Sequence, residues 1–152
     1  MTPMEFITRK LKALIEASGA TVSVVSLLLE ALAGEKHQAK SSCIAVNVHI
    51  ADQHVEPLPL YSFKATVILS VSIDDDKGGS LFVENYNALW AAFDYLARGD
   101  NCVELGSNPD DDTTVLVDGF QIGEGDPPDF ADDGNGGSWT TTFAASITGR
   151  AI

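Results

Sequence analysis

One segment of the chain, Tyr61–Ile73, alternates apolar residues with mostly small polar residues along its whole length. Successive side chains of a β-strand point to opposite faces of a sheet, so this alternation indicates a strand with one buried face. The segment Cys43–Ala51 has the same period of two. Between them, Asp52–Leu60 contains Pro57 and Pro59, which cannot donate to a strand ladder. The pattern predicts two half-buried antiparallel strands joined by a loop.

The N-terminal segment predicts an amphipathic helix over Pro3–Ser18. Thr2 can cap this helix, Pro3 suits its first position, and Glu5 completes a capping box. Apolar residues then recur at spacings of three and four, which is the period of one helix face. Gly19 is well placed to end the helix.

A second amphipathic helix is predicted over Ser80–Arg98, with Gly99 as its stop. Its apolar stripe consists of Phe82, Tyr86, Leu89, Trp90, Phe93 and Leu96. Several aromatic residues on one stripe predict a helix that packs flat on a sheet, and we interpret the stripe as core packing and not as a cofactor site.

The segment Val22–Ala33 is ambiguous. Its β-branched beginning favours a strand, whereas the leucine-rich end favours a helix. We favour a short helix that ends at Gly34 and leave the strand as the alternative.

The last third of the chain predicts strands over Cys102–Leu105, Thr113–Gln121 and Trp139–Thr148. Residues 122–138, rich in Gly, Asp and Pro, predict a long acidic loop. With 152 residues, the chain fits one domain. Strand runs broken by one long helix predict an α+β domain over residues 1–152, with an antiparallel or mixed sheet and two to three helices packed on one face.

The charge balance argues against nucleic acid as a partner. The chain carries 22 acidic and 9 basic residues, a net charge of −13, and its densest basic run is only Arg9, Lys10 and Lys12. Nonspecific affinity for phosphate depends on clustered cations. No segment reaches the roughly 20 apolar residues that span a bilayer, so we expect no membrane partner.

The acidic loop is the first candidate for a ligand site. Its oxygen donors are Glu124, Asp126, Asp129, Asp132, Asp133 and Asn135. Oxygen ligands on a flexible loop suit calcium, but the spacing lacks the pattern of an EF-hand. We therefore interpret the segment as a solvated turn-rich loop, assign no metal or cofactor to the chain, and keep calcium binding as an alternative.

Catalytic signatures are missing from the sequence. His37, His49 and His54 have no spacing typical of a metal site, and no nucleophile or phosphate-loop motif occurs. Cys43 and Cys102 lie in apolar, strand-like surroundings and are interpreted as reduced core thiols. We therefore predict no catalytic residue and no enzyme.

Pro127, Pro128 and Phe130 are the candidate interface residues. The two prolines hold an aromatic side chain on a stiff, extended segment of the acidic loop. An exposed aromatic residue in such a position is a plausible docking element. The alternative is that Phe130 folds back as a lid on the core.

The order of elements resembles the tail-terminator and minor-tail proteins of long-tailed bacteriophages. The stretches that carry the resemblance are Pro3–Ser18, Cys43–Ala51 with Tyr61–Ile73, Ser80–Arg98, and a close that runs from Val115–Phe120 to Ser138–Phe143. The extra segment Val22–Ala33 and the acidic loop depart from that pattern.

The resemblance implies a non-enzymatic structural protein of a phage or prophage tail. Such a protein forms a homo-oligomeric ring, usually six-fold, and contacts other tail or head-connector proteins. It would be found in the virion, or in the host bacterial cytoplasm during assembly. The alternative is a stand-alone α+β binding module, possibly one that binds calcium through the acidic loop.

Overall fold

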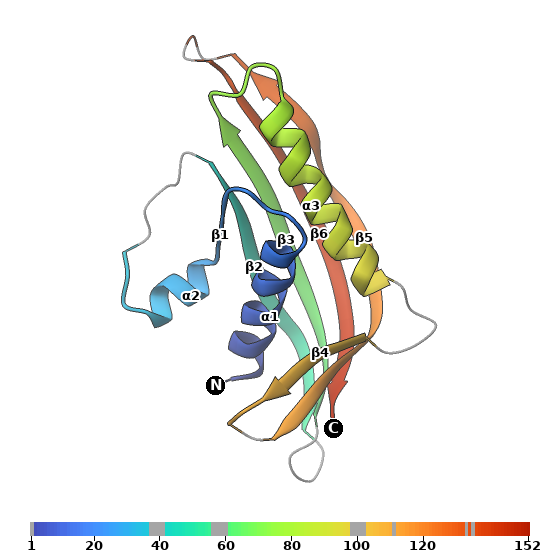
Figure 1. Ribbon diagram of the computed structural model, residues 1–152. Helices are drawn as coiled ribbons and strands as arrows, with labels where there is room; N and C mark the ends of the chain where they lie inside the picture. The colour runs from blue at the N-terminus through green and yellow to red at the C-terminus, as the bar shows by residue number, and fades with distance from the viewer. Residues whose placement is uncertain are drawn as a thin grey trace.

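The computed structural model describes residues 2–36, 42–55, 61–97, 103–110, 112–132, 134 and 136–152 (Figure 1). Helices and strands follow in the order α1 (Pro3–Ala17), β1 (Ser23–Val25), α2 (Leu27–Leu32), β2 (Cys43–Val55), β3 (Tyr61–Asp74), α3 (Ser80–Ala97), β4 (Val103–Asn108), β5 (Thr113–Ala131) and β6 (Ser138–Ala151). The strands form one six-stranded sheet in the order β1-β2-β3-β6-β5-β4.

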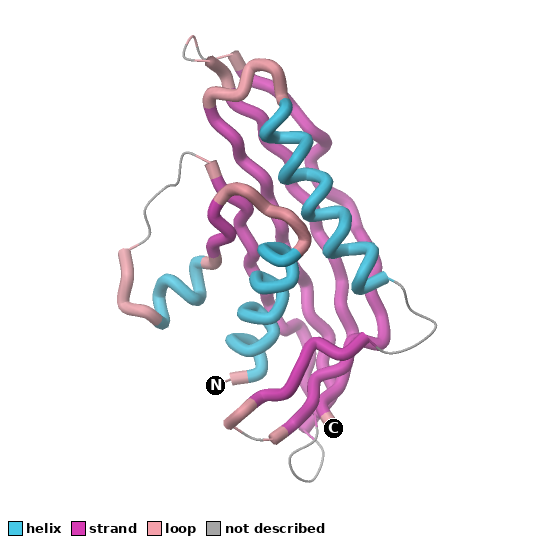
Figure 2. The backbone as a smooth tube through the Cα atoms, in the orientation of Figure 1, coloured by secondary structure: helices cyan, strands magenta, loops and turns pink. Residues whose placement is uncertain are grey.

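The sheet is mixed, because β1 runs parallel to β2 while every other neighbouring pair is antiparallel. Four long strands, β2, β3, β6 and β5, form its centre, and the short strands β1 and β4 lie at its two ends (Figures 1 and 2). The predicted mixed α+β architecture is therefore present, with strands making up more of the chain than helices.

The helices α1 and α3 cover one face of the sheet (Figure 1). Every second residue of β3, from Tyr61 to Ile73, is buried beneath them, as the alternation predicts. α1 contributes Phe6, Ile7, Leu11 and Ile15 to this core, and α3 contributes its aromatic stripe. Thr2 caps α1 by accepting a hydrogen bond of 3.2 Å from the Glu5 amide, so the predicted helix start is confirmed.

The opposite face of the sheet carries none of the described helices and is made mainly of small polar side chains. The alternate positions of β3 and β6 supply Ser62, Thr66, Ser70, Ser72, Thr140, Thr142, Ser146 and Thr148. Lys64 and Arg150 are exposed members of the same face. A hydroxyl-rich face of this kind tolerates water without exposing a large apolar area.

The segment Val22–Ala33 contains a strand and a helix, so the favoured prediction of a single helix is wrong in its first half. Ser23–Val25 form β1, and Ser26 then caps α2 by accepting from the Leu29 amide at 3.5 Å. The buried Ser26 therefore separates the β-branched residues that form the strand from the leucine-rich residues that form the helix.

The acidic segment 122–138 is a strand in its first part, so the loop prediction is wrong for residues 122–131. There β5 continues to Ala131 and pairs with β6 to the end of that strand. The composition concealed the strand, because bulges between Ile122 and Gly125 and between Asp126 and Asp129 place its glycines and prolines where ladder hydrogen bonds are interrupted.

Some sequence predictions fall on residues that the structure does not describe. These residues are His37, Pro57, Pro59, Gly99, Cys102, Asp133 and Asn135. Cys43 is half-buried at the start of β2, and its relation to Cys102 lies outside the described residues.

Gly149 allows β5 and β6 to approach closely, which leads to a first prediction. A methyl group at this position would lie 2.4 Å from the Leu116 carbonyl oxygen and 2.6 Å from the Phe63 ring. We expect Gly149→Ala to lower the free energy of unfolding by about 1–3 kcal/mol, since the backbone must move. Chemical denaturation measures this loss, and Gly78→Ala, where a methyl group meets nothing within 4 Å, is the control. Equal losses in both variants would contradict the close approach.

Candidate assembly edges

The first candidate site is the outer edge of β5. Beyond Val117, where its pairing with β4 ends, β5 has only β6 as a neighbour among the described residues. The stretch from Gln121 to Asp129 is exposed. A strand with one neighbour presents unpaired backbone amide and carbonyl groups, which can pair with another chain.

Parts of this edge are protected against indiscriminate pairing. Pro127 and Pro128 are exposed within β5 at a bulge, where a missing amide breaks no ladder bond. The exposed acidic residues are Asp118, Glu124, Asp126 and Asp129. Bulges, prolines and charges are the usual protections of an edge strand, and they leave Gly119–Ile122 as the regular part of the open edge.

Phe130 lies on the core side of β5 and is half-buried. Its ring is 5.0 Å from the Trp139 ring, and Trp139 in turn stacks on Phe82 at 5.3 Å. The Trp139 indole donates a 2.8 Å hydrogen bond to the Asp76 carbonyl. The structure therefore places Phe130 as a lid on the core, whereas Pro127 and Pro128 beside it remain exposed.

An aromatic cluster lies between α3 and the two strands β5 and β6. Its ring contacts, all between 5.0 and 6.1 Å, join Phe82, Tyr86, Trp90, Phe93, Phe120, Phe130, Trp139 and Phe143. Tyr86 and Trp90 are only half-buried, and Ile122 on β5 is 36% exposed. The open edge of β5 is therefore flanked by incompletely covered apolar side chains.

The second candidate site is the outer edge of β2, at the other end of the four long strands. β1 pairs only with Cys43–Ala45, so in the described part of the chain no strand pairs with the outer edge from Val46 to Val55. Asp52 is the only acidic residue from Val46 to Val55, and its exposed carboxylate lies 3.3 Å from the His54 imidazole. Val55 is 76% exposed.

Sequence reasoning missed the last part of the β2 edge, Asp52–Val55, because it ended the strand at Ala51. A bulge between Ile50 and Asp52 shifts the side chains by one position, so that Gln53 and Val55 take the core-facing register. The period of two breaks at that point. A search for two periodic segments offset by one residue would have extended the strand.

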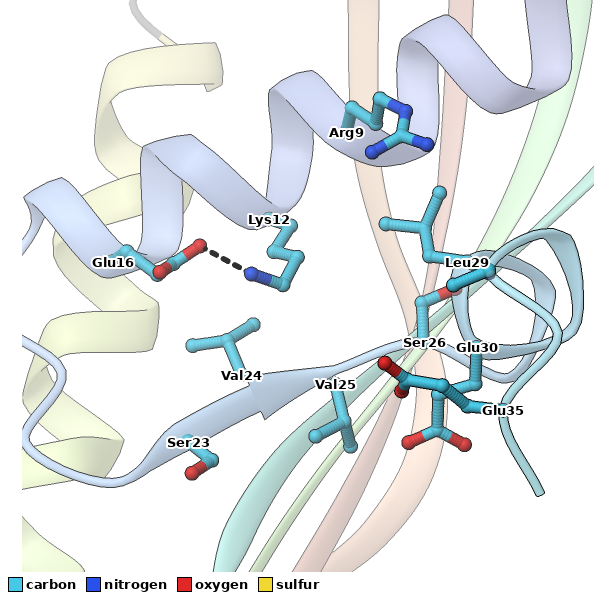
Figure 3. Close-up of a pocket in the computed structure, with 11 residues that line it drawn as sticks. Arg9, Lys12, Glu16, Ser23, Val24, Val25, Ser26, Leu29, Glu30 and Glu35 are labelled. Carbon is cyan, nitrogen blue, oxygen red and sulfur yellow. Dashed lines mark hydrogen bonds and ion pairs between the residues drawn. The ribbon is translucent and has the colours of Figure 1, made fainter. Parts of the chain in front are cut away.

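A groove of about 480 Å³ lies between α1, β1 and α2 (Figure 3). Arg9 and Lys12 line it from α1, and Glu30 and Glu35 line it from the opposite side. Both cations already have helical partners, Glu5 at 2.9 Å and Glu16 at 2.8 Å. In the described residues β1 pairs only with β2, so the far side of β1 is open beside this groove.

The predicted ligand donors do not gather into a metal site in the part of the chain that the structure describes, where no group of three or more His, Cys, Asp or Glu side chains could hold an ion. His49 and His54 lie on β2, five residues apart along an extended strand. The carboxylates of β5 are spread along an extended strand, which separates them. Asp133 and Asn135 lie outside the described residues.

Comparison with known proteins finds no matching family model and no matching curated protein. The fold defines a mixed α/β domain, one long sheet with two helices over one face. None of the described helices is both long enough and apolar enough to cross a bilayer.

Proposed function

We propose that this chain is a structural subunit of a phage or prophage tail, of the tail-terminator type. It forms a ring by self-association, with six copies as the expected number, and joins the tail to the head connector. Its partners are further copies of itself and other tail or head-connector proteins, in the virion and in the host cytoplasm during assembly. It has no catalytic role.

The observation that carries this proposal is that, in the part of the chain that the structure describes, the sheet has two long open edges of different sequence. One is the β2 edge from Val46 to Val55, and the other is the β5 edge from Gly119 to Ala131. Two unlike surfaces on one subunit favour a head-to-tail contact, and repeated head-to-tail contacts close into a ring when the rotation between copies permits it.

The charges favour contact between unlike edges. A pair of β5 edges would bring four exposed carboxylates of each copy together, namely Asp118, Glu124, Asp126 and Asp129. Like charges directly opposite each other destabilise paired strands. The β2 edge carries only Asp52 as an acid, together with two histidines, so it accepts the acidic edge with less repulsion.

The order of elements also supports the proposal. Helix, strand, strand, helix, strand, strand remains the frame of the fold as α1, β2, β3, α3, β5 and β6, with three short elements added: β1, α2 and β4. This is the order on which the resemblance to tail-terminator proteins rests.

Multi-angle light scattering over a wide range of protein concentration tests the proposal. We expect one discrete species with a mass close to six times the chain mass of 16.1 kDa, or a rise towards it with concentration. Calcium and a chelator should leave that mass unchanged. A two-fold dimer that does not grow further would contradict the proposal.

The groove beside β1 favours a second candidate, a stand-alone binding module. An extended segment of a partner could add to the open side of β1, with its charged groups facing Arg9 and Lys12. This candidate becomes the leading one if the chain is a monomer at every concentration measured.

A further inference from the structure

We infer that the ring closes by strand addition, with the β2 edge of one copy lying antiparallel on the β5 edge of the next copy. In this arrangement His49 of one copy is opposite Gln121 of its neighbour. The inference rests on the proposed self-association and adds to it the partner surface, the strand direction and the register.

The strand direction follows from the pairing within one copy. β2 is antiparallel to β3, β3 to β6, and β6 to β5, so β2 and β5 run in opposite directions. A second copy rotated about an axis parallel to the strands therefore presents its β2 antiparallel to β5 of the first copy. Antiparallel pairing needs no crossover connection and can occur between separate chains.

The register follows from rows of paired residues that cross the sheet. One row runs His49, Thr66, Ser146, Gln121, and its two ends are exposed on the uncovered face. Because the rotation axis is parallel to the strands, equivalent rows of neighbouring copies lie at the same position along that axis. The Gln121 end of one row then meets the His49 end of the next.

The rows on either side of this one place apolar residues together on the helix-covered face. Val48 shares a row with Ile122, and Ile50 shares a row with Phe120. All four side chains are incompletely buried in a single copy. Pairing the edges in this register would extend the core across the interface through two apolar cross-strand pairs.

The backbone of both edges is regular in these three rows. β2 is free of bulges from Cys43 to Ile50, and β5 is free of them from Gly119 to Ile122. The bulges at Ile50/Asp52 and Ile122/Gly125 lie just outside the paired rows. Bulges interrupt ladder pairing, so the regular stretches define where a neighbouring strand can add.

Disulfide trapping tests this register. The chain with serine at positions 43 and 102 receives His49→Cys together with Gln121→Cys, two exposed positions whose replacement should leave the fold intact. Opposed residues in an antiparallel pair are close enough for a disulfide bond. Under mild oxidation we expect a ladder of linked species up to the full ring on non-reducing gels.

Three controls make the result specific. Each single cysteine variant alone should give no linked dimer, whereas a mixture of the two should give a dimer and nothing larger. His49→Cys with Asn87→Cys, an exposed position on α3, should give no ladder. A linked dimer from one single variant alone would show edges of the same kind in contact and overturn the inference.

Light scattering on the same samples separates the two proposals. If the double variant forms the expected multimer but no ladder, the strand-addition interface is wrong and the ring proposal stands. If it stays monomeric at every concentration at which light scattering is recorded, both are wrong.

Discussion

Replacing Trp139 with alanine is expected to lower the free energy of unfolding by about 3 kcal/mol, the lower end of the range for large aromatic residues, because this side chain is half-buried. Trp139 lies between Phe82 and Phe130, and its indole donates to the Asp76 carbonyl at 2.8 Å. The substitution removes the contact between the turn before α3 and the start of β6. Urea denaturation measures the loss.

Trp139→Phe is the matched control for this prediction. It keeps a ring between the two phenylalanines but removes the hydrogen bond to Asp76 and part of the contact area of the indole, so we expect a loss of about 1–2 kcal/mol. If the phenylalanine variant were as unstable as the alanine variant, the hydrogen bond and not the aromatic stack would hold this end of the molecule.

Replacing Asn85 with leucine is expected to cost about 2–5 kcal/mol, because two backbone amides lose their acceptor. Asn85 is fully buried on α3, and its side-chain oxygen accepts from the Thr21 amide at 2.9 Å and the Val22 amide at 3.3 Å. Its amide group donates to the Thr21 hydroxyl and to the Leu81 carbonyl, each at 2.9 Å. These bonds attach the chain between α1 and β1 to α3.

Thr21→Val is the control for the asparagine. It removes one of the four hydrogen bonds and leaves both backbone amides paired, so we expect a loss of about 1 kcal/mol. Hydrogen exchange at the Thr21 and Val22 amides should accelerate strongly in Asn85→Leu and little in Thr21→Val. Similar exchange rates in the two variants would contradict the role assigned to Asn85.

The first part of β2, the strand β3 and the helices α1 and α3 could be predicted because each follows one period over many residues. Tyr61–Asp74 has a buried and an uncovered face throughout, and Pro3–Ala17 carries both a cap and an apolar stripe. Where one face of an element is buried against the core, apolar residues recur with the period of that element, and this pattern can be recognised in the sequence.

The second half of β5 could not be predicted from the same signal. Within the described residues, Ile122–Ala131 pairs on one side only, is exposed on both faces along most of its length, and carries bulges. Because neither face is buried along most of this stretch, it needs no alternating apolar residues, and turn-forming residues occupy the strand. The division of Val22–Ala33 at Ser26 was hidden for a different reason, since each part is too short to establish a period.

The candidate edges follow from the order of the strands in the sheet, and this order cannot be predicted from any single segment of the sequence. Among the residues that the structure describes, β4 pairs with β5 only as far as Val117, and β1 pairs with β2 only as far as Ala45. Both edges become visible once those short pairings are known. Pro127 and Pro128 lie on the β5 edge, and the strand that contains them is what gives the region an assembly role in our proposal.

Electron microscopy of the purified chain at high concentration tests the central claim most directly, because it shows the symmetry of the assembly. The account predicts closed rings of six copies with a central channel, in which each subunit contacts its two neighbours through different surfaces. Two-fold dimers, with the same surface of each copy in contact, would contradict the head-to-tail assembly that the two unlike edges support.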